Sequence, residues 1–532
     1  MILSLILAAV MLLGSEDNAG EVCTVIPVEF SDLKFSVQAN EIQGLVDDSE
    51  SYLKRQLPES RKIEFRVAGT VSLSRPYAYY GANSVSRKDE RVAEAVIESC
   101  RILNPDTDFS GIDYLMFVMA GPNESYGAGE DYFWPQQPKL SDYNLSLILD
   151  GRKFDDFAVC TELGPDGKIS GIGDFCHEFG HFLGLRDLYD TDGDGSGGTA
   201  PGLQGLSIMD TGNRNGDGHT PPDFCSVEYD QLGYGDSTVL RKGAFRLEPS
   251  SGSGKYAVLP SGSTRIYHLV ENRGGDNLFI VRIDRSNGFA GYSDYRRKNL
   301  TAAERWEVNE VNCRPDHQCA ELVKASAAGS FCGDSLSLIG IRKDGCDFVF
   351  NVIEAIVIKE IRTFQDGALV TWCSEISPSE IEDAGLAWWK DEGDIAEQVL
   401  TPTAGGLYVC SIEGLQPNTR YRLSFHITTK DGQSFQRTAT MLTEAYREGA
   451  IPFIMTDSDG RRDDGTYLPG SRLRLRVRNA PNAEGINWTF NGGRIYPDAE
   501  GLWAIPGTGT LKATLVRNDG SKDIIEKKII VR

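Results

Sequence analysis

The spacing of apolar and polar residues predicts a mixture of strands and helices up to about Gly233. Alternating or continuously apolar runs typical of strands occupy residues 21–31, 63–73, 113–120, 145–149 and 157–161. Apolar residues at helical spacing occupy residues 41–57 and 91–102. The run at 113–120 (DYLMFVMA) is continuously apolar after its first residue, which predicts a buried central strand. The pattern therefore predicts a first domain of α/β type, expected over residues 20–237.

Beyond about residue 238 the pattern predicts strands only. Short runs between Gly and Ser turns lie at 256–259, 266–270, 278–283 and 348–352, and regularly spaced strands follow at 368–373, 406–412, 421–428, 472–477, 486–490, 511–516 and 524–531. Ile412–Tyr421 (IEGLQPNTRY) resembles the turn and Tyr-bearing strand of a fibronectin type III sandwich, and the last strands have Ig-like spacing. We therefore expect a β-rich domain over 238–353, a fibronectin type III-like domain over 354–446 and an Ig-like sandwich over 447–532.

Length and charge narrow the class of protein. At 532 residues the chain is too long for one core, and 40% hydrophobic with 25% charged residues is typical of globular domains. The 77 acidic residues exceed the 54 basic ones, giving a net charge of −23, so no nucleic-acid partner is expected because the protein would repel a phosphate backbone. No apolar run reaches the roughly 18–20 residues of a membrane-spanning helix, so no transmembrane segment is expected.

The first residues differ from the rest of the chain. Met1–Gly14 is apolar except for Ser4, and a polar segment follows at once. This pattern predicts a signal peptide over residues 1–19, and hence a secreted or extracytoplasmic protein. The alternative is a buried N-terminal strand or helix.

The cysteines agree with export. Eleven are present, in groups of five, four and two: Cys23, Cys100, Cys160, Cys176 and Cys225; Cys313, Cys319, Cys332 and Cys346; Cys373 and Cys410. We expect disulfides within the groups, with one cysteine of the first group left over. A Cys/His zinc site around Cys313 and Cys319 is a less favoured alternative because no C-x₂-C spacing is present.

Residues 174–187 (DFCHEFGHFLGLRD) carry the candidate chemistry. On a helix, His177 and His181 stand one turn apart on one face, with about 6 Å between Cβ atoms, so both imidazoles can bind one metal ion. Glu178 leaves the same turn and can take a proton from a metal-activated water as general base. Two histidines and one carboxylate would leave the fourth position of a zinc site open, as catalysis requires.

Two carboxylates compete as the third ligand. Gly184 allows the helix to end and the chain to reverse, which can bring Asp187 to the metal. Glu228 is the alternative, because it can act as the downstream Glu does in thermolysin-like enzymes. We favour Asp187, since the distance along the chain from His181 to Glu228 is long.

The segment His177–Asp190 (HEFGHFLGLRDLYD) resembles the signature of the M6 (immune inhibitor A-like) metallopeptidases, zinc endopeptidases of the metzincin type. Further resemblances to the family lie at residues 25–32, 51–53, 76–81, 113–121, 133–135, 271–273 and 280–284. The resemblance implies a metzincin-like α/β catalytic domain that hydrolyses peptide bonds, with Met209 in the Met-turn beneath the zinc. Arg186 stands where the family usually has Pro.

A possible calcium loop follows the site. Asp190, Asp192 and Asp194 take the first, third and fifth places of an EF-hand-like loop with Gly195 sixth, although Pro201 replaces the bidentate Glu at the twelfth. Residues 213–218 repeat the pattern with weaker ligands. The alternative is two polar, Gly-rich loops without calcium.

Two functions are compatible with these features. The favoured one is a secreted zinc endopeptidase acting on a protein or peptide substrate. The other is a non-catalytic adhesin or binding protein with a vestigial zinc-peptidase domain. The intact HExxH motif favours the enzyme, and the C-terminal sandwiches would then direct it to an extracellular matrix, glycan or cell-surface target.

Overall fold

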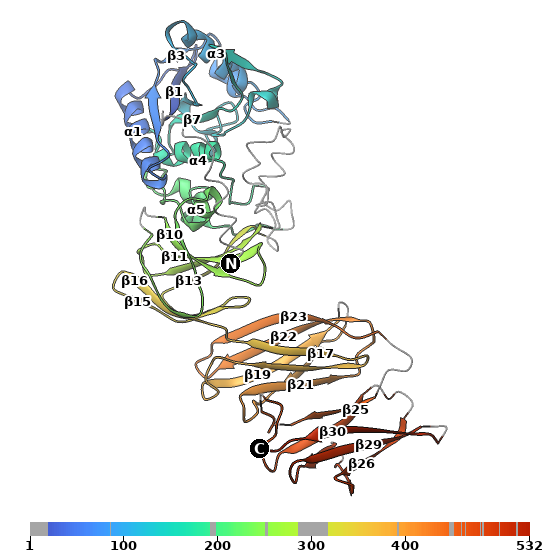
Figure 1. Cartoon of the computed structure of the whole chain (residues 1–532). Helices are drawn as coiled ribbons and strands as arrows, with labels where there is room; N and C mark the ends of the chain where they lie inside the picture. Colours follow the sequence, from blue (N-terminus) through green and yellow to red (C-terminus); the bar gives the residue numbers. More distant parts are fainter. Residues whose placement is uncertain are drawn as a thin grey trace. The chain divides into compact units, whose positions relative to one another are not determined.

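The computed structural model of the chain describes residues 20–85, 87–191, 198–250, 254–285, 318–390, 393–445, 452–458, 460–462, 464–478, 480, 483–498, 501–517 and 520–532 (Figure 1). These residues form two compact units. The first consists of the described residues up to Val239, of Leu247–Val258 and of the described part of Arg265–Ala325. The second consists of Leu240–Arg246, Leu259–Thr264 and the described part of Ser326–Arg532. The signal peptide expected over residues 1–19 lies outside the described residues.

A parallel sheet forms the centre of the first unit. Its strand order is β2-β1-β4-β7, and β3 also pairs with β1. The strands are β1 (Glu21–Glu29), β2 (Ile63–Val67), β3 (Val71–Ser72), β4 (Tyr114–Pro122) and β7 (Ala158–Leu163). All these pairings are parallel, and Cys23 of β1 lies opposite Phe65 of β2 and Tyr114 of β4. β4 is buried along almost its whole length, as its apolar run predicts.

Helices cover both faces of this sheet (Figure 1). The helices α1 (Ala39–Gln56) and α4 (Ile172–Leu183) share one core with the β1 residue Val25, whereas α3 (Val92–Leu103) shares a second core with its neighbour Ile26. Because successive side chains of a strand point to opposite faces, the two cores lie on the two sides of the sheet. The helices and strands expected in this part of the chain are confirmed, with their ends shifted by a few residues, except that the run at 63–73 forms two strands, β2 and β3, instead of one.

Shorter elements complete this α/β layer. They are α2 (Tyr77–Gly81), α5 (Ser226–Leu232), the hairpin of β5 (Leu147–Leu149) with β6 (Arg152–Phe154), and 3-10 turns at Asn104–Asp106, Glu124–Tyr126, Leu140–Tyr143, Gln204–Leu206 and Thr211–Arg214. The last two turns and α5 follow α4 (Ile172–Leu183) in the chain, and the turn at Thr211–Arg214 contacts that helix.

A second sheet of the first unit packs on the same core as α4. Its order is β13-β12-β11-β10-β8, from the strands β8 (Asp236–Val239), β10 (Lys255–Pro260), β11 (Ile266–Asn272), β12 (Leu278–Asp284) and β13 (Ala320–Ser326). Leu269 and Val281 of this sheet belong to the core that contains Phe179 of α4. Glu271 of β11 also accepts a hydrogen bond of 2.8 Å from the backbone N–H of Ser226, the first residue of α5.

The described part of the second unit contains strands and no helix, as the sequence predicts. Its sheets have the orders β14-β15-β16-β9, β17-β18-β21, β20-β19-β22-β23, β24-β25-β28 and β27-β26-β29-β30. The strands are β9 (Gly243–Leu247), β14 (Ala328–Cys332), β15 (Ser337–Asp344), β16 (Asp347–Ile353), β17 (Val357–Thr363), β18 (Gly367–Cys373), β19 (Ile381–Trp389), β20 (Ala396–Val399), β21 (Leu407–Glu413), β22 (Arg420–Thr429), β23 (Ser434–Leu442), β24 (Phe453–Asp457), β25 (Arg472–Arg478), β26 (Ala483–Phe490), β27 (Gly493–Ile495), β28 (Leu502–Ala504), β29 (Gly509–Arg517) and β30 (Lys522–Ile529).

The strands β17 to β23 enclose an aromatic core. Trp372 is fully buried and stacks on Tyr408, with 4.1 Å between ring centroids. The hydroxyl oxygen of Tyr421 accepts a hydrogen bond of 3.0 Å from the backbone N–H of Gln416, five residues earlier. Such a bond fixes the turn before a sandwich strand, as the tyrosine corner does in Ig-like sandwiches.

The cysteines do not pair as the sequence predicts. The five of the first group, Cys23, Cys100, Cys160, Cys176 and Cys225, are buried free thiols. Several are held apart by the sheet, since Cys23 lies on β1 and Cys160 on β7 with β4 between them. Burial raises the pKa of the Cys23 and Cys160 thiols well above the ordinary range, which keeps them protonated and unreactive.

Strand register also opposes the pairing expected in the last group. Cys373 lies opposite Leu407, and Cys410 lies opposite Val370, so three positions of the ladder separate the two cysteines. That offset corresponds to roughly 10 Å along the strands. A disulfide tolerates at most about 7 Å between the two Cα atoms, so Cys373 and Cys410 are too far apart to form one. Cys313, part of the alternative zinc site, lies outside the described residues.

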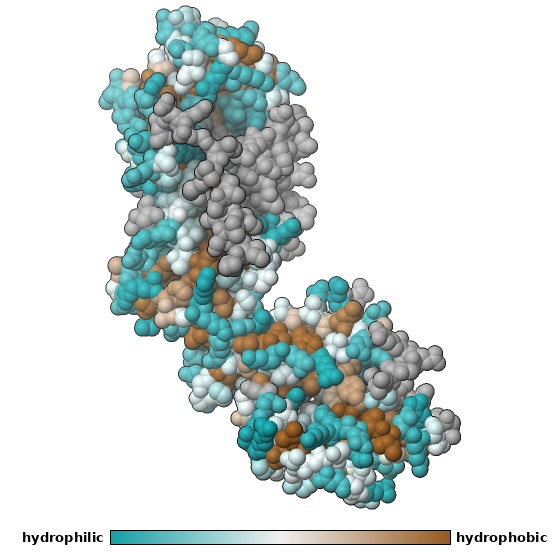
Figure 2. All heavy atoms as spheres, in the orientation of Figure 1, coloured by the Kyte–Doolittle hydropathy of each residue, from teal (hydrophilic) through white to brown (hydrophobic). Residues whose placement is uncertain are grey.

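The visible face of the molecule is largely hydrophilic, with apolar residues gathered in separate patches (Figure 2). In the second unit the large apolar side chains that are more than half exposed are Ile395, Val399, Leu442, Tyr496 and Ile524. In the described part of the chain, no helix is long and apolar enough to cross a membrane.

Candidate metal centre

The helix α4 places the histidines. Its apolar residues Phe175, Phe179 and Phe182 recur at helical spacing and are buried in the core, where Phe179 contacts Phe65 of β2 with 5.1 Å between ring centroids. This anchoring sets the rotation of the helix about its axis. The residues at the intervening positions, including the histidines, therefore face away from the sheet.

Two glycines allow the chain to pass close to the start of α4. A Cβ atom on Gly173 would lie 1.8 Å from the carbonyl oxygen of Asn213, and one on Gly171 would lie 2.1 Å from the carbonyl carbon of Gly218. The backbone N–H of Gly173 donates a hydrogen bond of 2.8 Å to the carbonyl of Gly218. The turn after Met209 is thereby held against the first turn of the helix.

Gly184 ends the helix and reverses the chain, as the sequence predicts. Its φ of +104° lies in the left-handed region that favours glycine. Its backbone N–H donates to the carbonyl of His181 at 3.0 Å, and the N–H of Leu185 donates to the carbonyl of Gly180 at 3.0 Å. The chain then runs back beneath the helix and brings Asp187 to the two histidines.

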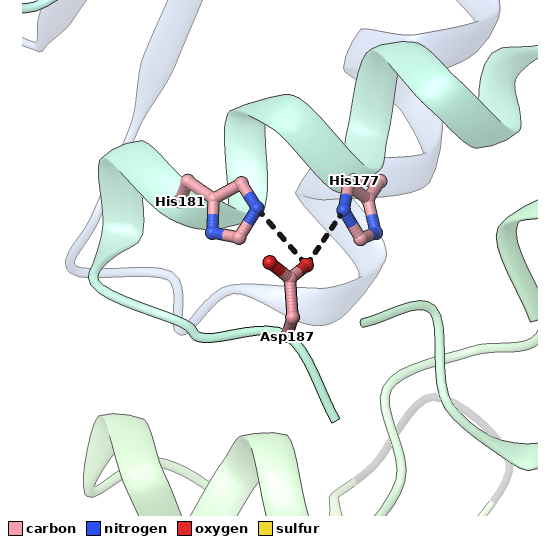
Figure 3. A group of neighbouring side chains, drawn as sticks. All are labelled: His177, His181 and Asp187. Carbon is pink, nitrogen blue, oxygen red and sulfur yellow. Dashed lines mark ion pairs between the residues drawn. The ribbon is translucent and has the colours of Figure 1, made fainter. Parts of the chain in front are cut away.

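The structure brings His177, His181 and Asp187 together (Figure 3). The Oδ1 atom of Asp187 lies 3.2 Å from Nε2 of His177 and 3.4 Å from Nε2 of His181. One ligand atom from each residue lies within 4.8 Å of the others, and in the described residues this is the one group of three such side chains. Two imidazole nitrogens and a carboxylate oxygen are donors that zinc favours, so the group fits a zinc ion.

Backbone carbonyls orient both imidazoles. Nδ1 of His177 lies 2.8 Å from the carbonyl oxygen of Ile208, and Nδ1 of His181 lies 2.8 Å from that of Leu185. Because a carbonyl only accepts, each Nδ1 carries a proton and donates it. In the neutral ring the lone pair is then on Nε2, the atom that faces Asp187, as metal binding requires.

The charges in the group are strongly coupled. Burial alone would lower the pKa of His177, but the hydrogen bond that its imidazole donates to Asp187 and the charge of Glu178 raise it to about 10. Burial alone would raise the pKa of Asp187, but the two histidines hold it well below its usual range. Without a metal the group is therefore an imidazolium–carboxylate cluster, and a metal ion would take the place of protons.

Glu178 is buried beside this cluster, with 4% of its surface exposed. Burial raises the pKa of its carboxyl group to about 7, although the neighbouring histidines act in the opposite direction. A carboxylate with a pKa near neutrality can both accept and return a proton at physiological pH. The position and the pKa suit a general base.

Met209 lies beneath the helix and is fully buried. A Cβ atom on Gly180 would lie 2.7 Å from the sulfur of Met209, so the two residues are in direct contact. The carbonyl oxygen of Met209 accepts a hydrogen bond of 2.7 Å from the N–H of Leu188, next to Asp187. The segment around Met209 therefore supports both the helix and the loop that carries the carboxylate.

Glu228, the alternative third ligand, faces other partners. Its Oε1 atom accepts the hydroxyl hydrogen of Ser207, and its Oε2 atom accepts the backbone N–H of Cys225 at 2.8 Å. It is not part of the cluster of His177, His181 and Asp187. The arrangement favours Asp187 as the third ligand.

Several residues at the site were not identified from the sequence. Asp174, one turn before His177, is buried and accepts hydrogen bonds from the side chains of Asn123, at 2.9 Å, and Asn213, at 3.1 Å. The ring of Tyr189 lies 6.4 Å from that of His177, and the charge of Asp187 raises its pKa. The spacing to His177 could have indicated Asp174, but nothing local identifies its two asparagine partners.

The possible calcium loops are only partly described. Asp190 accepts a hydrogen bond of 2.7 Å from the backbone N–H of Ala200, whereas Asp192 and Asp194 lie outside the described residues. In the second loop the side-chain amide of Asn215 donates to the carbonyl of Gly205 at 3.0 Å. These bonds involve only the described residues of the two loops, and calcium stays a prediction from the sequence.

Comparison with known proteins points to a peptidase family. Residues 102–237 match the profile of the family described as Immune inhibitor A peptidase M6, catalytic domain. Over 209 residues the chain is 28% identical to the Pre-pro-metalloprotease PrtV of Vibrio cholerae serotype O1, in strains M66-2 and ATCC 39315 / El Tor Inaba N16961. The match covers 33% of this chain and 22% of that protein, so the chain spans about a fifth of the length of these curated relatives.

Solved structures of bacterial adhesion proteins are only remotely similar. One is a tetra-tandem repeat from the extending region of a large adhesion protein, at 12% identity over 40% of this chain and 61% of that one. The others are a 1.5-MDa bacterial ice-binding adhesin, at 10% identity over 37% and 75%, and a Ca²⁺-stabilised adhesin of an Antarctic bacterium, at 12% identity over 37% and 56%. All three have a TM-score of 0.14, which carries no argument about fold or function.

Proposed function

We propose that the protein is a zinc-dependent endopeptidase with a metzincin-like catalytic domain. The observation that carries the proposal is the convergence of His177, His181 and Asp187 within 4.8 Å, beside the buried carboxyl group of Glu178. The match of residues 102–237 to an M6 peptidase profile supports the same reaction class. The contact of Met209 with Gly180 of α4 supports assigning Met209 to a Met-turn.

In this proposal His177, His181 and Asp187 hold the metal. When bound there, zinc supplies a Lewis acid that makes water more acidic and polarises a peptide carbonyl. The hydrogen bonds from Nδ1 of each imidazole to Ile208 and Leu185 keep both Nε2 atoms directed at the metal. Asp187 adds a negative charge that offsets part of the charge of the cation.

Glu178 serves as the general base. It takes a proton from water as the water oxygen attacks the carbonyl carbon of the scissile bond. It then gives that proton to the amide nitrogen, which leaves as an amine when the carbon–nitrogen bond breaks. Burial raises the pKa of this carboxyl group above its usual range, which favours its holding the proton between the two transfers.

The competing proposal is a non-catalytic adhesin or binding protein. A binding protein has no need of a buried carboxyl group beside three metal ligands, and keeping one buried is costly. The adhesin-like structures have TM-scores too low to favour the alternative. We therefore favour the endopeptidase over the binding protein.

The rest of the chain is assigned supporting roles. We propose that residues 354–446 form a fibronectin type III-like sandwich and 447–532 an Ig-like one, consistent with the sheets of three and four strands in each. They would bind an extracellular matrix, glycan or cell-surface target and so bring the peptidase to its substrate. Export is inferred from the apolar segment at residues 1–14.

The test combines zinc analysis with a peptide-library digest of the purified full chain. We expect about one zinc per chain and cleavage of internal peptide bonds that a chelator abolishes and added zinc restores. Glu178→Gln is the matched control for a contaminating protease, since it changes one atom of the proposed base. Zinc-loaded wild-type protein that cleaves no peptide would overturn the proposal in favour of the binding protein.

A further inference from the structure

Glu228 is a buried acidic residue for which the proposed reaction has no direct use. It lies on α5 with no exposed surface, and burial raises the pKa of its carboxyl group. A carboxyl group in such a place is costly unless donors surround it. Its donors are the hydroxyl of Ser207, on Oε1, and the backbone N–H of Cys225, on Oε2 at 2.8 Å.

Ser207 connects Glu228 to the turn around Met209 by hydrogen bonds. Its hydroxyl oxygen accepts a hydrogen bond of 3.0 Å from the backbone N–H of Met209 while its hydrogen is donated to Glu228. Its carbonyl oxygen accepts the N–H groups of Asp210, at 3.2 Å, and Gly212, at 3.1 Å. Ser207 is fully buried, so these bonds do not compete with bulk water.

The same turn contacts the metal ligands from two sides. The carbonyl oxygen of Ile208 lies 2.8 Å from Nδ1 of His177 and sets the orientation of that imidazole. The carbonyl oxygen of Met209 accepts the N–H of Leu188 at 2.7 Å and fixes the loop just after Asp187. The carbonyl groups of two consecutive residues, Ile208 and Met209, therefore hold the imidazole of His177 and the loop that carries Asp187.

We propose that Glu228 is a positioning residue for the metal centre, which acts through Ser207 to hold the carbonyl groups of Ile208 and Met209 in place. This inference rests on the proposed function, in that the centre binds zinc. Glu228 does not touch the metal. Glu228 restricts the conformations of His177 and Asp187 in the metal-free protein. Substitution of Glu228 therefore weakens zinc binding although all three ligands remain. Outer-shell partners of this kind typically change metal affinity about 10–100-fold.

The test measures the zinc dissociation constant of the metal-free full chain by competition with a chromophoric chelator. Glu228→Ala and Ser207→Ala should each raise Kd about 10–100-fold. Glu228→Gln keeps an acceptor for the Ser207 hydroxyl and should stay within about threefold of wild type. The double variant should bind zinc about as well as either single variant, because both changes break one chain of hydrogen bonds.

Glu271→Ala is the matched control. Glu271 is also a buried carboxylate that caps the start of α5, through the N–H of Ser226, but its bonds do not include Ser207. It should lower stability without changing Kd for zinc. Ser207→Ala, which removes only a hydroxyl oxygen, keeps the test decisive if Glu228→Ala does not fold.

Three results would count against the inference. Unchanged zinc affinity in folded Ser207→Ala and Glu228→Ala would remove the positioning role. A loss of more than about 1,000-fold in Glu228→Ala that Gln does not restore would indicate direct ligation instead, since it exceeds an outer-shell effect. Additive effects in the double variant would show that the two residues act separately. Failure of the proposed function is distinguishable, because it would show in the wild type itself, which would then bind no zinc or would bind zinc and cleave no peptide.

Discussion

Gly180 of α4 lies directly against the side chain of Met209. A Cβ atom at Gly180 would come within 2.7 Å of the methionine sulfur and 3.4 Å of its terminal methyl carbon. The glycine inside the HEFGH sequence is therefore the residue that allows the turn carrying Ile208 and Met209 to approach the helix. That approach in turn brings the Ile208 carbonyl to His177.

Gly180→Ala should destabilise the protein, although the same change in a helix usually stabilises it. The added methyl group would press on a fully buried methionine, which typically costs about 1–3 kcal/mol. Gly44→Ala in α1 is the control, since nothing lies within 4 Å of a Cβ there and a gain of about 0.5–1 kcal/mol is expected. Urea unfolding of both metal-free variants measures the change in the free energy of unfolding. If Gly180→Ala stabilises the protein as much as Gly44→Ala does, the result would contradict the contact with Met209.

Glu178→Gln should remove peptide hydrolysis while zinc stays bound. The amide cannot take a proton from water, and loss of a general base typically costs about 100-fold or more in rate. The three metal ligands are untouched, so zinc content should equal that of wild type. Rates on a fluorogenic peptide and zinc analysis of the same sample provide the measurement, and undiminished hydrolysis would rule out Glu178 as the base.

Asp187→Ala should weaken zinc binding more than any change at Glu228. The variant loses an anionic oxygen donor, which leaves only two imidazoles to hold the ion. The expected rise in Kd therefore exceeds the about 10–100-fold of an outer-shell change. Zinc retained by Asp187→Ala through dialysis that strips Glu228→Ala would reverse the assignment of the third ligand.

A chain ending at Ile353 should still cleave short peptides. All proposed ligands and the base lie before Val239, and the strands β8 to β16, which follow the helices, are retained. Glu178→Gln in the same shortened chain is the control for background hydrolysis. A folded but inactive protein would mean that residues after Ile353 contribute to the site.

Asp89 should make stability depend on pH. Its side chain is fully buried, and burial raises its pKa to about 8, compared with about 4 in the unfolded chain. Between pH values of about 4 and about 8 the folded state therefore keeps a proton on Asp89 that the unfolded state releases. The contribution of Asp89 to the free energy of unfolding is full below a pH of about 4 and is lost as the pH rises through about 8.

Asp89→Asn should remove this part of the pH dependence. Asparagine tolerates the φ of +46° at this position and can still accept the bonds from the Trp134 N–H and the Gln136 side chain. The difference in melting temperature between wild type and variant, measured from pH 5 to pH 9, should move in favour of the variant as pH rises. A difference that is constant across this range would show that Asp89 titrates normally.

Local patterns in the sequence were sufficient for much of this protein. The helix of His177 and His181, its end at Gly184 and the strands of both units follow from periodicity and from the backbone freedom of glycine. These signals lie within a few residues of one another, and the chain geometry that they dictate is local. For the same reason Asp187, three residues after the helix cap, was predicted beside the histidines.

The sequence does not show which distant residues contact one another, because that depends on how the elements pack. The sequence favours Asp187 as the third ligand but leaves Glu228 as an alternative, and in the folded chain Glu228 is hydrogen-bonded to Ser207 instead. Cysteine spacing predicted disulfides, whereas the sheet keeps Cys23 and Cys160 on separate strands as buried thiols. Hydrogen bonds between segments far apart in the chain leave no periodic trace, because they depend on the packing of whole elements rather than on the neighbours of each residue.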